Sequence, residues 1–220
     1  MSDDLLFGTN DFAENPEPRV PCVLLLDVSG SMQGARIREL NDGIVSFKDA
    51  VAADTLASKR VEVAVVTFGG EVEVVTPFTT VAAYQPTALK ARGDTPMGAA
   101  ILRATDMVKA RKEEYKANGI SYYRPWIFMI TDGGPTDAWK QAAEEVARGE
   151  ESKAFLFLAV AVQGANVETL RKITPGGVRE LQGLEFRELF MWLSASMKSV
   201  SQSSLGTAIQ LPPTDKWAVI

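Results

Sequence analysis

Four predominantly apolar segments constrain the fold of this 220-residue chain more than any other feature. They occupy residues 20–26, 61–68, 126–131 and 155–162, and none of them alternates strictly between apolar and polar side chains. A strand with one face in water alternates, whereas the strands of a parallel sheet are apolar throughout because helices cover both of their faces. We therefore predict that these segments are buried strands of a parallel sheet.

The segments between these strands carry apolar residues at helical spacing. In residues 36–53, Leu40, Ile44 and Phe47 fall on one side of a helix, with Asp42 and Asp49 elsewhere. The same periodicity predicts further helices at 96–117, 139–148, 166–173 and 186–200. Strands and helices therefore alternate along the chain.

Two shorter strands complete this pattern. Residues 72–78 follow the pair Gly69-Gly70, which predicts a hairpin with an antiparallel strand at the sheet edge, and residues 178–181 read as a short last strand. Alternating strands and helices with right-handed crossovers give an α/β fold. We predict a doubly wound, mostly parallel six-stranded sheet with one antiparallel edge strand and helices on both faces.

The length of the chain favours one domain with short extensions. Residues 1–18 are a polar leader that ends in Asn15-Pro16-Glu17-Pro18, and we expect the domain at 19–201. Residues 202–220 form a tail without a clear period, in which Leu211-Pro212-Pro213 argues against a helix. We expect Trp217, Val219 and Ile220 to pack back on the domain.

The composition excludes several classes of function. Histidine is absent, which excludes catalysis by histidine and zinc sites with histidine ligands. The net charge is −5 with no block of basic residues, which argues against nucleic acid as a partner. No apolar run is long enough to span a membrane, and the acidic leader is unlike a secretory signal. The lone Cys22, which we expect to be buried, also fits a cytoplasmic protein.

Oxygen-bearing side chains follow the predicted buried strands. Asp27, Ser29 and Ser31 come directly after the first strand, Thr95 precedes the second long helix, and Asp132 follows the strand 126–131. Ligands of open α/β sheets bind at the carboxyl ends of the strands, where all three groups are expected. Two carboxylates and three hydroxyls suit Mg²⁺ or Mn²⁺ better than Ca²⁺, which takes a larger shell.

Simpler interpretations exist for each of these residues. An Asp-x-Ser-x-Ser sequence is common in turns, where it satisfies loop backbone. Thr95 could cap a helix, and Asp94 and Asp137 are interpreted as caps or solvated loop carboxylates. The aromatic residues Tyr122, Tyr123 and Trp126 are expected to pack at the entry to a strand.

The separated motifs resemble a known family. Asp27-x-Ser29-x-Ser31, a threonine and Thr131-Asp132-Gly133 are similar to the metal-ion-dependent adhesion site of von Willebrand factor A domains, whose sheet is Rossmann-like. Together with the leader and Tyr122-Tyr123-Arg124-Pro125-Trp126, the chain resembles the bacterial TerY/YegL type of stand-alone A domain. The resemblance implies that Ser29, Ser31 and Thr95 contact Mg²⁺, with Mn²⁺ or Ca²⁺ as alternatives. Asp27 and Asp132 would coordinate it directly or through water.

The resemblance also implies a function. A free sixth position on the metal would take an Asp or Glu of a protein partner, so the chain is expected to be a binding module and not an enzyme. Proteins of the TerY type are associated with a kinase, a metal-dependent Ser/Thr protein phosphatase and tellurite or stress response, which suggests a scaffold or regulator with those partners.

Two other functions are compatible with these residues. An Asp after a buried strand is also a phosphoryl-transfer nucleophile, which would make the chain a metal-dependent phosphatase. That pattern, however, needs a second Asp two residues later, where this chain has Ser29. Alternatively, the chain is a regulatory substrate whose phosphorylation at Ser29, Ser31 or Thr95 would bring negative charge into the metal pocket.

Overall fold

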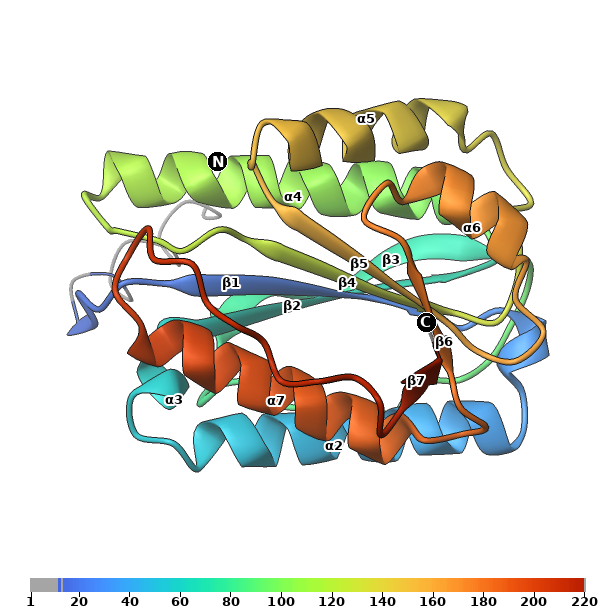
Figure 1. Ribbon diagram of the computed structural model, residues 1–220, viewed down its shortest axis with the longest axis horizontal. Coiled ribbons are helices and arrows are strands. Elements are labelled where there is room, and N and C mark those ends of the chain that lie inside the picture. Colours follow the sequence, from blue (N-terminus) through green and yellow to red (C-terminus); the bar gives the residue numbers. More distant parts are fainter. Residues whose placement is uncertain (1–11, 13, 220) are drawn as a thin grey trace, which may run out of the picture.

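A single mixed sheet between two layers of helices forms the body of the protein (Figure 1). The computed structural model describes Phe12 and residues 14–219. The strands, in chain order, are β1 (Val20–Asp27), β2 (Val61–Gly69), β3 (Glu71–Thr80), β4 (Trp126–Thr131), β5 (Leu156–Ala161), β6 (Val178–Leu181) and β7 (Ala218–Val219). They lie in the order β3-β2-β1-β4-β5-β6-β7.

The helices cover both faces of this sheet (Figure 1). The helices are the 3-10 turn η1 (Gly30–Met32), α2 (Ala35–Ala52), α3 (Ala57–Arg60), α4 (Met97–Ala117), α5 (Lys140–Glu151), α6 (Val167–Ile173) and α7 (Phe186–Gln202). Helices α4, α5 and α6 lie on one face, and α2, α3 and α7 lie on the other.

The predicted fold class is confirmed. All six predicted strands are present, and β3 pairs antiparallel with β2 at one edge. A two-residue strand, β7, extends the other edge by pairing antiparallel with β6. Neither β7 nor the one-turn helix α3 was predicted, because two and four residues are too short to show a period. The start of α3 is fixed instead by Asp54, whose Oδ1 accepts hydrogen bonds from the backbone N–H groups of Leu56 and Ala57.

Strand β1 is buried on both faces, as its sequence predicts. Its side chains alternate between two cores: Cys22, Leu24 and Leu26 join the core beneath α2 and α7, while Val23 and Leu25 join the core beneath α4 and α5. The expected burial of Cys22 is confirmed, and burial raises the pKa of its thiol to about 12. Helices are therefore required on both sides of the sheet.

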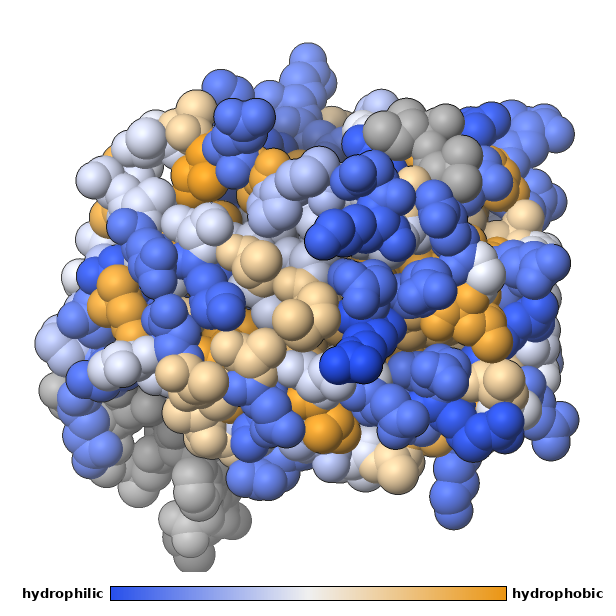
Figure 2. Space-filling model, turned by 60° about the horizontal axis from the view of Figure 1, so that its bottom comes forward, coloured by the Kyte–Doolittle hydropathy of each residue, from blue (hydrophilic) through white to orange (hydrophobic). Residues whose placement is uncertain are grey.

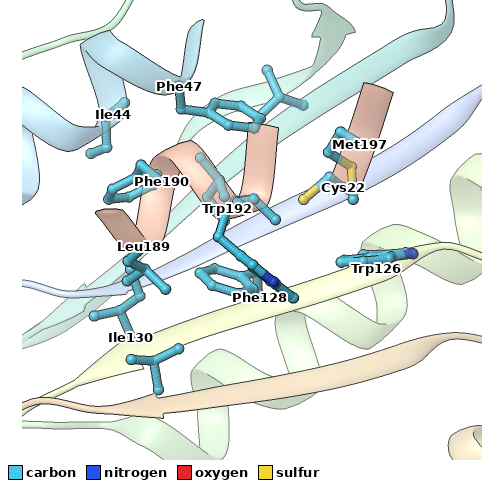
Figure 3. Close-up of a cluster of buried hydrophobic side chains, with 14 of the residues drawn as sticks. Cys22, Ile44, Phe47, Trp126, Phe128, Ile130, Leu189, Phe190, Trp192 and Met197 are labelled. Atoms are coloured by element: carbon cyan, nitrogen blue, oxygen red, sulfur yellow. The ribbon is translucent and has the colours of Figure 1, made fainter. Parts of the chain in front are cut away.

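The core beneath α2 and α7 is built from large side chains (Figure 3). Ile44 and Phe47 of α2 meet Leu189 and Phe190 of α7 above the central strands. The two helices approach closely at Gly43, where an added Cβ would lie 2.2 Å from the ring of Phe190. This packing fixes α2, which follows directly after the loop that carries Ser29 and Ser31.

A buried charged cluster lies at the amino ends of the parallel strands, opposite the predicted site. We call it the Glu62 network: Arg19, Glu62, Arg111 and Tyr115. The Glu62 carboxylate is fully buried and accepts hydrogen bonds from Arg19 Nε at 2.9 Å, from Arg111 Nε and Nη2 at 2.8 Å, and from the Tyr115 hydroxyl. Each carboxylate oxygen thus has two donors.

The Glu62 network also holds the end of the leader against the domain. Arg19 donates to the backbone carbonyls of Asn15 and Glu17. The ring of Phe12 lies 4.7 Å from the guanidinium carbon of Arg111 and packs edge-on against Tyr115. The rest of the predicted leader, residues 1–11 and 13, lies outside the described residues.

The C-terminal tail runs back along α7 toward β6 (Figure 1). The indole of Trp192 donates to the carbonyl of Pro212 at 2.7 Å, and Trp217 is buried with its ring centroid 5.3 Å from that of Trp192. Figure 2 shows this side of the molecule as mostly hydrophilic, with small separate hydrophobic areas. Ile220 lies outside the described residues. Among those described, no helix has the length and apolar character to cross a bilayer.

The Glu62 network yields a prediction about stability. Glu62→Gln should lower the free energy of unfolding by about 3–5 kcal/mol, because it leaves two arginines with an incomplete counter-ion in the interior. Glu73→Gln is the matched control, since Glu73 pairs with Arg92 on the surface and should lose less than about 1 kcal/mol. Urea denaturation of the two variants measures both values, and equal losses would contradict a structural role for the network.

Candidate metal centre

Asp27 ends β1 and lies at the centre of the predicted site. Its carboxylate is fully buried: Oδ1 accepts a hydrogen bond from the backbone N–H of Ser29 at 2.8 Å, and Oδ2 accepts one from the hydroxyl of Thr131 at 2.5 Å. Thr131 ends β4, which pairs in parallel with β1, so the ends of the two strands meet here. The parallel register thereby positions Asp27 at the carboxyl edge of the sheet.

Ser29, Ser31 and Asp132 form a chain of oxygen atoms beside Asp27. The hydroxyls of Ser29 and Ser31 are 3.0 Å apart, and the Ser31 hydroxyl donates to Asp132 Oδ1 at 2.6 Å. Ser29 and Asp132 are buried, while Ser31 is exposed. The short turn η1 folds the serines back from their alternating strand geometry, so that both hydroxyls face the loop after β4.

Thr95 is brought to the site by close contacts between loops. The backbone N–H of Gly30 donates to the carbonyl of Gly93, and that of Gly70 donates to the carbonyl of Asp94, both at 2.9 Å. A Cβ added at Gly133 would lie 3.4 Å from Thr95 Oγ1 and 3.9 Å from Asp27 Oδ2. The Thr95 hydroxyl and the Asp27 carboxylate therefore both lie within van der Waals contact of the position that a side chain at Gly133 would occupy.

The structure thus brings together all five oxygen donors predicted from sequence: Asp27, Ser29, Ser31, Thr95 and Asp132. Adjacent ligands of an octahedral Mg²⁺ ion at 2.0–2.1 Å lie about 3 Å apart, which the spacing of the two serine hydroxyls matches. Within the part of the chain that the structure describes, no three Asp, Glu or Cys side chains gather in a way that could hold a metal ion. A cation in this pocket would therefore depend on hydroxyl oxygens as well as on the two carboxylates.

The electrostatic state of Asp27 also fits a cation site. Burial raises the pKa of its carboxyl group, the hydrogen bonds from Ser29 and Thr131 oppose that effect, and the nearby Asp132 adds to the rise. A buried carboxylate whose charge is incompletely compensated is a favourable ligand for a cation.

The sequence reasoning missed Arg36 and the direct role of Thr131. Arg36 Nη1 donates to Asp132 Oδ2 at 2.7 Å and to the carbonyl of Ser31 at 2.9 Å, and Nη2 donates to the carbonyl of Gln163 at 2.9 Å. One feature of the sequence could have indicated Arg36. It lies in the first turn of α2, where the helix dipole disfavours a cation, so a contact with an acidic side chain elsewhere in the chain could have been expected.

The simpler interpretations have different outcomes. The interpretation of Asp137 as a cap is confirmed, because its carboxylate accepts from the backbone N–H groups of Gly98 and Ala99 at the start of α4. The alternative that the Thr95 side chain caps this helix is wrong, because Asp137 accepts from the N–H groups of Gly98 and Ala99 and the backbone carbonyl of Thr95 accepts from that of Met97. Asp94 is exposed. Tyr123 and Trp126 are buried and Tyr122 packs on Tyr115, as expected.

Comparison of the sequence with known families gives one match. The profile of the von Willebrand factor type A domain matches residues 22–135, a stretch that contains all five donors and Arg36. No curated protein matches the chain.

Solved structures with the same fold come from distant proteins. The pilus adhesin SpaC from Lactobacillus rhamnosus GG, in its open conformation, superposes with a TM-score of 0.67 at 16% identity, over 84% of this chain and 30% of SpaC. Proximal thread matrix protein 1 from the mussel byssus, with a zinc-occupied MIDAS motif, gives 0.55 at 16% identity, over 83% and 48% of the two chains. The ArnB paralog VWA2 from Sulfolobus acidocaldarius gives 0.53 at 15% identity, over 81% and 45%. The chain spans less than half the length of each, and the likeness concerns the fold alone.

The loop contacts at Gly93 predict an asymmetry between two glycines. Gly93 and Gly119 have similar positive φ angles of 65° and 67°, but an added Cβ at Gly93 would lie 2.5 Å from Gly70 Cα, whereas at Gly119 it would meet nothing within 4 Å. Gly119→Ala should therefore lower the free energy of unfolding by about 1 kcal/mol, and Gly93→Ala by about 3 kcal/mol or more. Urea denaturation measures the difference, and equal losses would argue against tight packing of the Thr95 loop.

The raised pKa of Asp27 predicts a dependence of stability on pH in EDTA. Because folding raises this pKa, the carboxyl group contributes stability below its unfolded pKa, and this contribution is lost as the pH rises through the folded pKa. Asp27→Asn, which is neutral at every pH, should therefore be more stable than wild type at pH 7, with the gap closing toward acid. Urea unfolding at several pH values measures this gap. A variant less stable at pH 7 would show that the charge is already compensated.

Proposed function

The chain belongs to the von Willebrand factor type A domain family, and from this we propose that it is a metal-dependent protein-binding module that grips an acidic residue of a partner protein. The observation that carries the proposal is the convergence of five oxygen donors from three loops at one edge of the sheet. Residues 19–201 would form the domain, and residues 202–220 would be a tail packed on it.

The proposed ligands divide into two kinds. Ser29, Ser31 and Thr95 would supply neutral hydroxyl oxygens, while Asp27 and Asp132 would bind the cation directly or through water. Two carboxylates only neutralise a divalent ion, so it would keep its affinity for an incoming anion. An Asp or Glu of the partner is the anion that a protein can supply at the remaining position.

Mg²⁺ is the metal we propose, with Mn²⁺ as the closest substitute. Both accept all-oxygen shells that include water, whereas Ca²⁺ takes six to eight oxygens at longer distances. Zinc occupies the corresponding motif in the mussel protein. In this chain, however, the pocket offers none of the nitrogen or sulfur ligands that Zn²⁺ favours.

Binding is better supported than catalysis. A metal-dependent phosphatase would need a nucleophile beside an acid or base, but Ser29 stands where a second Asp would be expected, and the chain has no histidine. Phosphatase activity that is lost in Asp27→Ala would instead favour the enzyme.

A second alternative is a regulatory substrate, because phosphorylation of Ser29, Ser31 or Thr95 would add negative charge to the pocket. Mass spectrometry after co-expression with a kinase would detect it.

The cellular context is proposed on the TerY/YegL resemblance alone. On that basis the partners are a kinase and a metal-dependent Ser/Thr protein phosphatase, in a cytoplasmic system linked to tellurite resistance or stress response. The leader with Asn15-Pro16-Glu17-Pro18 and the strand entry Tyr122-Tyr123-Arg124-Pro125-Trp126 are the parts of this chain that carry the resemblance.

Metal binding is tested by titrating the purified protein with Mg²⁺ and Mn²⁺ after EDTA treatment. A bound metal at 100 times its Kd should add about 2.7 kcal/mol to the free energy of unfolding of wild type. Ser29→Ala should lose most of this gain, because it removes one of the proposed ligands. Asp94→Ala is the matched control: it removes an exposed carboxylate next to Thr95 and should keep the full gain.

Partner binding is tested by affinity purification of wild type and Ser29→Ala from the source cells, each with Mg²⁺ and with EDTA. Partners of the proposed site should appear only with wild type in Mg²⁺. Partners that are retained equally in EDTA would contradict metal-dependent partner binding, even if the titration shows that the protein binds a metal.

A further inference from the structure

We propose that Arg36 sets the charge and the orientation of the metal centre, so that the loaded site selects an acidic ligand at the expense of affinity for the bare cation. This inference rests on the proposed function, since it assigns a role to a residue beside the proposed ligands. Arg36 is a positioning residue, because it acts through Asp132 and is not itself a ligand.

Arg36 ties together three loops at the carboxyl edge of the sheet. Its guanidinium donates to the carbonyl of Ser31 after β1, to the carboxylate of Asp132 after β4, and to the carbonyl of Gln163 after β5, over 2.7–2.9 Å. These three loops contain three of the five proposed ligands. A planar group with fixed donors is suited to holding several acceptors in one arrangement.

The two oxygens of Asp132 have separate partners. Oδ2 accepts from Arg36, and Oδ1 accepts from the hydroxyl of Ser31 at 2.6 Å. The Asp132 side chain is fully buried, whereas that of Arg36 keeps 30% of its surface exposed. The ion pair therefore orients Oδ1 toward the serines and places a positive charge at the mouth of the pocket.

The position of Arg36 at the start of a helix is electrostatically unfavourable unless its charge is compensated. It lies in the first turn of the 18-residue helix α2, which has no acidic residue there, and a cation at a helix N-terminus is disfavoured. Its contacts with Asp132 and the two carbonyls offset this effect.

The net charge of the pocket determines which ligands it favours. Asp27 and Asp132 carry two negative charges and Arg36 carries one positive charge, so the pocket has a net charge of −1 before a divalent cation binds and +1 afterwards. Arg36 therefore repels the incoming metal but favours a single carboxylate on the loaded site. Its removal should change the two affinities in opposite directions, which loss of a merely structural contact would not do.

The test measures both affinities in wild type, Arg36→Gln and Arg36→Lys. Mn²⁺ binding is followed by calorimetry, and carboxylate binding is followed by NMR titration of the Mg²⁺-saturated protein with acetate, with neutral acetamide as the control ligand. Arg36→Gln should bind Mn²⁺ about five- to tenfold more tightly and acetate about three- to tenfold more weakly. Arg36→Lys, which keeps the charge, should stay within about twofold of wild type for Mn²⁺.

Arg92→Gln is the matched control variant. It makes the same chemical change on another rim loop, where Arg92 pairs with the exposed Glu73, and it should alter neither affinity by more than about twofold. Urea unfolding of the metal-free variants verifies that each is folded.

Failure of wild type to bind Mn²⁺ overturns the metal centre and the role of Arg36 with it. Binding of Mn²⁺ by wild type, with unchanged or weaker Mn²⁺ binding by Arg36→Gln, overturns the role of Arg36 alone. Opposite shifts in the two affinities support it.

Discussion

Burial of the sheet on both faces is the constraint from which the rest of this structure follows. The central strands have no side that can accept a charged group, so ionised side chains are confined to their two ends. At the amino end, Glu62 contacts two arginines and a tyrosine, and each of its two carboxylate oxygens accepts two hydrogen bonds. At the carboxyl end, Asp132 pairs with a single arginine, and Asp27 accepts hydrogen bonds only from the neutral groups of Ser29 and Thr131. The same fold thus contains one charge cluster that is complete in itself and one that is left short of positive charge.

Much of this arrangement could be predicted from the sequence because it depends on local patterns. The apolar runs of β1, β4 and β5 identify buried strands, and a parallel sheet brings their carboxyl ends to one edge. That rule alone places Asp27, Ser29, Ser31 and Asp132 near one another. Thr95 could be added because its loop leads into α4, although its approach to Asp27 depends on packing among Gly70, Gly93 and Gly133 that no periodicity reveals.

The parts that could not be predicted depend on tertiary contacts between distant segments. Strand β7 has two residues, and it pairs with β6 only after the tail has crossed the face of α7. The partners of Arg36 lie up to 127 positions away along the chain, and their geometry depends on how three loops come together. The family match ends at residue 135, so it contains every proposed ligand, whereas Gln163, which completes the contacts of Arg36, lies beyond it.

The path of the C-terminal tail restricts the movement of helix α7. Trp192 of α7 is bonded to Pro212 and packed against Trp217, and the segment that carries them ends as a strand of the sheet itself. A slide of α7 by one helical turn, about 5.4 Å, would break the indole hydrogen bond and separate the two rings. The helix is therefore held to the sheet through buried residues of the tail, and a movement of α7 by one turn would first have to break these contacts.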